Sequence, residues 1–126
     1  MKIEALELLI LLNICHWLGD YTHLSRDWML SAKRLGKPLT PIFLHAMVHA
    51  ILMGIVLMLY IKGIMFFWLL LFELITHFLI DVLKGRLNYW FPKLSNPANK
   101  YHWYVFGADQ FLHQLIIIII VFIAIV

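Results

Sequence analysis

Four long apolar stretches within 126 residues constrain this fold more than any other feature of the chain. They cover approximately residues 3–20, 41–61, 64–84 and 103–126. A helix needs roughly 20 apolar residues to cross about 30 Å of hydrocarbon, and each stretch is close to that length. With 63% hydrophobic and 13% charged residues, so short a chain cannot hide its apolar surface from water. The sequence therefore predicts an integral membrane protein.

All four stretches are expected to be helices, because a segment in lipid must satisfy its own backbone hydrogen bonds. We predict an all-α membrane protein in which residues 1–126 form a single integral membrane domain, a four-transmembrane-helix bundle. The lone Cys15 excludes a disulfide scaffold. The scarcity of polar surface argues against a nucleic-acid partner, despite the net charge of +3. The expected partner is the lipid bilayer, and a homo-oligomer is left open.

The basic residues predict how the helices are oriented. Eight of the ten lie in or beside two long connections, residues 21–40 and 85–102, whereas Lys2 and Lys62 lie on the other side. Basic loops stay in the cytoplasm according to the positive-inside rule. We therefore predict a multi-pass protein of the inner (plasma) membrane, with residues 21–40 and 85–102 as cytoplasmic loops and both termini extracytoplasmic.

Every apolar stretch carries one pair of ionisable residues spaced i,i+4 near its cytoplasmic end. The pairs are His16 with Asp20, His45 with His49, His77 with Asp81, and Asp109 with His113. Side chains four residues apart lie on one face of a helix, one turn from each other. The predicted topology puts all four pairs at the same depth in the membrane, so we expect them to form one His/Asp cluster.

The free-energy cost of burying these ionisable residues in the membrane favours a metal site. An Asp in mid-membrane costs about 2.5–3.5 kcal/mol, whereas a hydrogen bond between helices returns only about 0.6 kcal/mol. Bound structural zinc contributes on the order of 10 kcal/mol. We therefore predict that all eight residues of the pairs are metal ligands for one or two divalent ions of Zn, Mn or Fe, which suit imidazole and carboxylate donors. A proton or ion pathway and a purely structural polar bundle remain as alternatives.

Further residues near the pairs are candidates for catalysis and substrate binding. Glu73 precedes His77 by one turn, and Asp81 and Glu73 are the candidate catalytic bases. Lys84 and Arg86 are the candidate substrate-binding residues. The first-helix and third-helix pairs are 61 residues apart (16 to 77), and the second and fourth pairs 64 (45 to 109), which hints at two pseudo-repeated helical hairpins.

The paired residues also carry a family resemblance. The sequences HWLGD at 16–20, LHAMVHA at 44–50, THFLIDVLK at 76–84 and DQFLH at 109–113 resemble small bacterial membrane proteins grouped as domain of unknown function 3307. The resemblance covers nearly the whole chain and supports the site. It implies no particular reaction, because the family brings no established activity.

The sequence leaves several functions open. The favoured hypothesis is a metal-dependent membrane hydrolase that acts on a lipid-like or phosphorylated substrate. Catalysis needs an open coordination position, however, and eight protein ligands could saturate two ions. The alternatives are a di-iron lipid oxidase or hydroxylase, a metal carrier or sensor, and a purely structural polar bundle.

Overall fold

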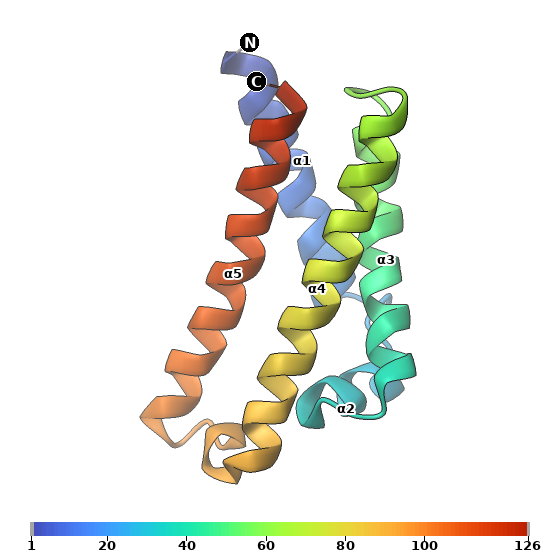
Figure 1. The fold of residues 1–126 in the computed structure, drawn as a ribbon. Coiled ribbons are helices and arrows are strands. Elements are labelled where there is room, and N and C mark those ends of the chain that lie inside the picture. The colour runs from blue at the N-terminus through green and yellow to red at the C-terminus, as the bar shows by residue number, and fades with distance from the viewer. Residues whose placement is uncertain (1, 126) are drawn as a thin grey trace.

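The computed structural model describes residues 2–125. Over that range the chain is all-helical, with five α-helices and one short 3-10 helix. They are α1 (Lys2–Tyr21), α2 (Asp27–Leu35), α3 (Leu39–Leu57), α4 (Ile64–Trp90), η1 (Pro92–Ser95) and α5 (Lys100–Ile125). Figure 1 shows α1, α3, α4 and α5 running alongside one another, with α2 and η1 at one end of the bundle. The start of α1 and the end of α5 lie together at the opposite end.

Within residues 2–125, three helices are long and apolar enough to cross a membrane: α3, α4 and α5. The chain is therefore an all-helical membrane protein with at least these candidate spans. The fourth predicted span, α1, is less apolar than the others. Every 18-residue stretch of α1 contains three charged residues, drawn from Lys2, Glu4, Glu7 and Asp20. Its packing beside α3 and α5 nevertheless makes it part of the bundle.

The structure differs from the sequence expectation in residues 21–40, expected as a loop, which contain the helix α2. Asp27 in its first turn and Lys33 and Arg34 in its last turn complement the helix dipole. Gly36 follows with a φ of 64°, a left-handed conformation that suits glycine and ends the helix. Met29 and Ala32 are buried, so this short helix is docked on the bundle.

Two helices also end at residues other than those predicted from the sequence. The helix expected at 41–61 ends at Leu57, because the chain turns over residues 58–60. The helix expected at 64–84 continues through Gly85 to Trp90. Pro92, which cannot continue an α-helix, lies two residues after Trp90 and begins η1.

Each long helix turns one row of residues, spaced i+4, towards the centre of the bundle. The rows are Leu8, Leu12, His16 and Asp20 on α1; His45, His49, Met53 and Leu57 on α3; Leu69, Glu73, His77 and Asp81 on α4; and Asp109, His113, Ile117 and Val121 on α5. Such rows are the ridges through which helices pack. The rows of α1, α3 and α5 each contain two apolar and two ionisable residues, whereas the α4 row has Leu69 as its one apolar member.

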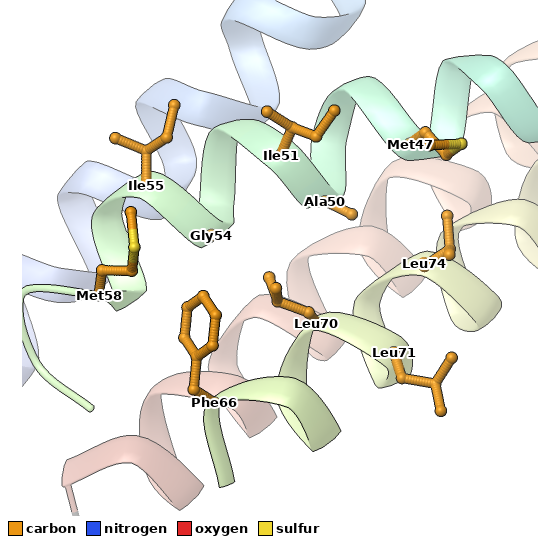
Figure 2. A pocket seen from close by; sticks show the side chains of 10 residues that line it. All are labelled: Met47, Ala50, Ile51, Gly54, Ile55, Met58, Phe66, Leu70, Leu71 and Leu74. Atoms are coloured by element: carbon orange, nitrogen blue, oxygen red, sulfur yellow. The ribbon is translucent and has the colours of Figure 1, made fainter. Parts of the chain in front are cut away.

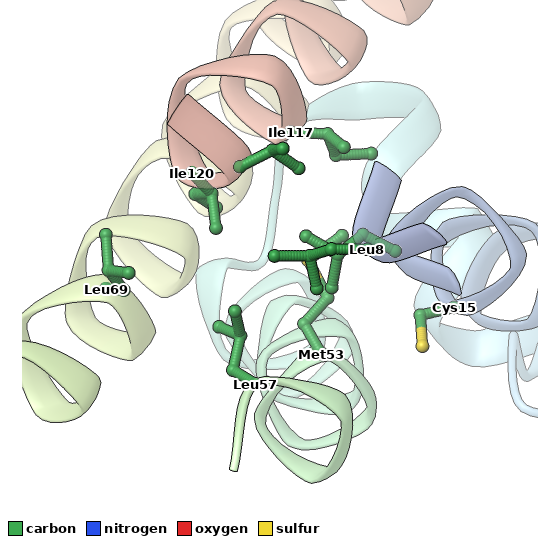
Figure 3. Packing of buried hydrophobic residues seen from close by; sticks show 9 residues of the cluster. Leu8, Cys15, Met53, Leu57, Leu69, Ile117 and Ile120 are labelled. Carbon is green, nitrogen blue, oxygen red and sulfur yellow. The ribbon is translucent and has the colours of Figure 1, made fainter. Parts of the chain in front are cut away.

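The apolar halves form the hydrophobic core. Figure 3 shows the side chains that meet there from all four long helices, among them Leu8, Met53, Leu57, Leu69 and Ile117. This core lies between the site and the end of the bundle that holds the start of α1 and the end of α5. It brings the four helices together in one register, so the ionisable halves of the rows also come together.

The outer surface of the bundle is apolar as well. An exposed groove of 430 Å³ lies between α3 and α4 and is lined by apolar residues (Figure 2), among them Met47, Ile51, Ile55 and Leu71. Many other large apolar side chains face outwards, including Phe67 and Phe122. A surface of this kind suits contact with hydrocarbon chains rather than water.

Candidate metal centre

The eight residues of the four i,i+4 pairs meet in one cluster between α1, α3, α4 and α5. All five imidazoles are buried. Their ring centroids are separated by as little as 3.9 Å, between His49 and His77, and 4.2 Å, between His77 and His113. The carboxylates of Asp20, Asp81 and Asp109 surround these rings at ion-pair distances. The structure thus brings together all eight residues of the four pairs.

Close packing between α1 and α3 contributes to this arrangement. A side chain at Gly19 would overlap the ring of His49, because even a Cβ atom would lie 2.6 Å from His49 Nε2. Glycine at this position lets α1 approach α3 closely enough for Asp20 Oδ1 to lie 3.2 Å from His49 Nε2 and 2.9 Å from His45 Nε2. The glycine of the HWLGD sequence therefore has a steric role in the site.

Three of the five histidines have an Nε2 atom without a hydrogen-bond partner among the described residues, and Nδ1 of His16, His45 and His49 also lacks one. His16, His77 and His113 each offer one ligand atom, and these atoms lie within 4.8 Å of one another. The Nε2 atom of each is buried and makes no hydrogen bond to any described residue. Buried polar atoms are normally hydrogen-bonded because desolvation is costly. The three histidines are thus close enough together to coordinate one ion.

The distances from these nitrogens to the carboxylates suit a shared metal ion. His77 Nε2 lies 3.4 Å from Asp81 Oδ2, and His113 Nε2 lies 3.5 Å from Asp109 Oδ1. These separations are long for hydrogen bonds. Two ligands on one tetrahedral ion, with bonds of about 2.0–2.1 Å, lie roughly 3.3–3.4 Å apart. Both the donor types and their spacing therefore fit a divalent ion such as Zn²⁺, Mn²⁺ or Fe²⁺.

Glu73 lies behind His77, one turn farther into the bundle. It is buried, and its Oε1 lies 3.1 Å from Nδ1 of His77. A proton on Nδ1 then points to Glu73, which leaves Nε2 of the same ring free to bind a metal. Histidine ligands in metal sites are commonly oriented by a carboxylate in this way. The contact makes Glu73 a residue that orients His77.

Lys33 is the site residue that sequence reasoning missed, since its charge was attributed to membrane orientation alone. Its Nζ donates a hydrogen bond to Asp20 Oδ1 at 3.1 Å, and it lies 3.3 Å from Asp81 Oδ1 and 3.0 Å from His45 Nε2. Burial lowers the pKa of Lys33, but the carboxylates of Asp81 and Asp20 outweigh burial and hold this pKa above its usual range. These contacts place Nζ of Lys33 inside the cluster, facing three of its donor atoms.

Direct backbone contact between α2 and α4 delivers Lys33 to the cluster. A Cβ atom at Gly85 would overlap the backbone of Gly36 and of Lys33. A Cβ atom at Gly36 would in turn lie 2.8 Å from the carbonyl oxygen of Val82. Glycines at both positions thus allow the end of α2 to touch α4. A sequence signal for α2 existed, since Met29 and Ala32 share one face of a short amphipathic segment.

The two predicted substrate-binding residues lie in different places. Lys84 Nζ donates to Asp109 Oδ2 at 3.1 Å, and Lys84 also lines a cavity of 310 Å³ at the α2 end of the bundle. Arg86 lies instead beside Gly36, on the side of α4 that α2 covers. The cavity reaches the cluster at Asp20 and is otherwise lined by Tyr21, Leu30, Lys33, Arg34, Lys84, Asn88, Ser95, His102, Phe106 and Gln110.

The chain belongs to the family described as "Protein of unknown function (DUF3307)", whose model matches residues 8–126. This match confirms the resemblance carried by the paired motifs, and it includes every residue of the cluster. No curated protein and no solved structure matches the chain. The function therefore has to be argued from the site itself.

Proposed function

We propose that this member of the family is a metal-dependent hydrolase of the inner (plasma) membrane, acting on a lipid-like or phosphorylated substrate. One observation carries the proposal. The Nε2 atoms of His16, His77 and His113 are buried together without hydrogen-bond partners among residues 2–125, and carboxylate oxygens lie 3.4–3.5 Å from them. A divalent ion satisfies all of these atoms at once.

The chemistry follows from the groups around that point. A divalent ion held there would supply an activated water and would stabilise negative charge that develops on the substrate. Asp81 lies 3.4 Å from both His77 Nε2 and His113 Nε2, close enough to accept a proton from such a water. Of the two candidate bases, we assign this role to Asp81. Glu73 holds the ring of His77 in place.

The polar cavity supports the proposed substrate class. It lies at the end of the bundle that carries most of the basic residues, and it reaches the cluster beside Asp20. Arg34 and Lys84 line it, and side chains of this kind bind phosphate oxygens through charge-assisted hydrogen bonds. An anionic headgroup could therefore approach the centre from the cytoplasmic surface of the membrane.

This arrangement requires α1 to be a fourth span. Glu4 and Glu7 lie in the first two turns of α1 and Asp20 in its last, so the charges are concentrated near its ends. Four spans put both termini on the extracytoplasmic side, opposite α2 and its basic neighbours. A reporter fused at either end should accordingly report the extracytoplasmic side. A cytoplasmic C-terminus would contradict this topology.

The central test is metal content together with hydrolysis. Detergent-purified protein should contain at least one divalent ion per chain and should release product from an anionic phospholipid. His113→Ala should lose both the metal and the activity. His23→Ala, which removes an exposed histidine outside the cluster, should keep both. Wild-type protein with less than about 0.2 equivalents, not restored by zinc, manganese or iron, would contradict the metal centre.

A metal carrier or sensor is the second candidate. It is favoured by the abundance of donors, because the eight paired residues outnumber the ligands of one tetrahedral ion. Such a protein would exchange its ion readily with a chelator in solution and would turn over no lipid. Slow exchange together with turnover would favour the hydrolase.

A further inference from the structure

The cluster contains two neighbouring sets of donors that differ in what they face. The first set, His16, His77 and His113, presents ring nitrogens without hydrogen-bond partners in the described chain. The second set consists of Asp20 Oδ1, Asp81 Oδ1 and His45 Nε2. All three atoms of the second set surround the ammonium of Lys33, at 3.1, 3.3 and 3.0 Å respectively. The second set therefore already holds a cation.

Two carboxylates join the sets. Asp81 Oδ1 lies 3.3 Å from Lys33 Nζ and 3.4 Å from His113 Nε2. Asp20 reaches Lys33 through Oδ1 and lies 3.5 Å from His16 Nε2 through Oδ2. Carboxylates that face two cation positions in this way are typical of centres with two metal ions about 3.5–4 Å apart. Here one of the two positions is taken by a side chain.

The charges of the buried groups favour the same arrangement. Within residues 2–125, four carboxylates belong to the cluster, those of Asp20, Glu73, Asp81 and Asp109. Lys33 and Lys84, which are paired with three of them, supply two positive charges. With the five imidazoles neutral, as metal ligands are, a single divalent ion would supply two more and would make the cluster neutral. A second ion would leave an excess of positive charge in a medium that solvates charge poorly.

We infer that the ammonium of Lys33 occupies the second cation position, so that the centre pairs one divalent ion with one lysine. This inference rests on the proposed metal centre and defines its composition. Lys33 is then a positioning residue, which holds Asp20 and Asp81 towards the ion. A centre with one divalent ion and one lysine also argues against a di-iron oxidase, because such an enzyme needs both cation positions for iron.

The contact between α2 and α4 fixes this lysine in place. Gly36 and Gly85 bring the backbones together, and Met29 and Ala32 are buried beneath α2. Because α2 is docked in this way, Lys33 is not a mobile surface side chain that a free ion would readily displace. Removing the ammonium, rather than adding more metal, is therefore the way to open the second position.

The test counts metal ions in Lys33→Met, which keeps an unbranched side chain and removes the charge. Lys37→Met is the matched control, because Lys37 lies over the ring of Tyr89 at 3.8 Å and outside the cluster. Each purified protein is dialysed to equilibrium against Mn²⁺ and examined by elemental analysis and electron paramagnetic resonance. Wild type and Lys37→Met should each bind one ion, with the spectrum of isolated Mn²⁺. Lys33→Met should bind a second ion, with the spectrum of a spin-coupled pair.

The outcomes separate the inference from the proposed function. Two ions in wild type, or one ion in both wild type and Lys33→Met, would overturn the role of Lys33 while leaving the metal centre intact. No ion in wild type would overturn the metal centre itself.

A second variant keeps the inference testable if Lys33→Met does not fold. Lys33→Gln also removes the charge but keeps a polar side chain, and it should likewise bind a second Mn²⁺ ion with the spectrum of a spin-coupled pair. A single ion in Lys33→Gln would overturn the inference.

Discussion

In the half of the bundle nearest the α3–α4 turn, the inward rows carry residues such as Leu8, Met53 and Leu69. In the other half, the same rows carry His16, His45 and Asp81. The apolar half is complete as it stands, since its side chains need only one another. The ionisable half carries buried polar atoms without partners among the described residues, and these are costly in a medium of low polarity. The same helix rows therefore contain one half that needs only apolar contacts and one half whose buried polar atoms need partners.

The two halves differ in their need for added positive charge. Packing in the apolar half is modest in energy, because lipid chains are as apolar as leucine. It is also independent of solution conditions. The ionisable half needs cations, and Lys33 and Lys84 supply part of that requirement from within the chain. In the proposed metal centre, a divalent ion supplies the remaining part.

The largest effect is therefore expected on metal removal. If free metal is at 1,000 times its dissociation constant, binding stabilises the folded state by about 4 kcal/mol, and a chelator should remove this stabilisation. His77→Ala should be destabilised and should no longer respond to chelator. Unfolding in detergent, followed with and without chelator, measures both. Wild-type protein that ignores chelator would show that the two halves do not differ in this respect.

In the apolar half, Leu8→Ala should lower the free energy of unfolding by about 2 kcal/mol, because it leaves a cavity at a fully buried position. The loss should be the same with and without chelator, since Leu8 lies about two helical turns from His16. Ile10→Ala, at a position that is 52% exposed, should change stability by less than about 0.5 kcal/mol. A Leu8→Ala protein without metal would show that the halves are coupled.

Asp81→Asn should weaken metal binding by about tenfold or more, which corresponds to about 1.4 kcal/mol. The substitution keeps the shape of the side chain and removes the charge that faces His77, His113 and Lys33. Titration with a competing chelator measures the affinity. Asp27→Asn, at an exposed position in the first turn of α2, is the control and should bind metal as wild type does. Unchanged affinity in Asp81→Asn would remove Asp81 from the site.

The smallest effect on metal affinity should come from Glu73→Gln. The amide oxygen can still accept a hydrogen bond from His77 Nδ1, so we expect metal affinity to fall only about threefold. Glu73→Leu cannot accept this bond and should lose about tenfold or more. The same chelator titration compares the two. Equal affinities for both variants would show that Glu73 does not orient His77.

The ionisable half of the rows could be predicted from the sequence, whereas its lysine could not. Pairs such as His16 with Asp20 are visible because helical spacing is a local property of the chain. Lys33 reaches the cluster only through the contact of Gly36 with Gly85, which belong to different helices and share no periodic pattern. The fourth predicted span stays a prediction, because three charged residues remain in every 18-residue stretch of α1.

The distribution of the three histidines of the proposed metal centre also bears on how the protein is made. His16 belongs to α1, whereas His77 and His113 belong to α4 and α5, which are synthesised later. This triad is complete only once α5 has been synthesised and packed, so metal loading of the proposed centre would follow assembly of the whole bundle. A chain that stalls before α5 would lack His113 and could not form the proposed centre.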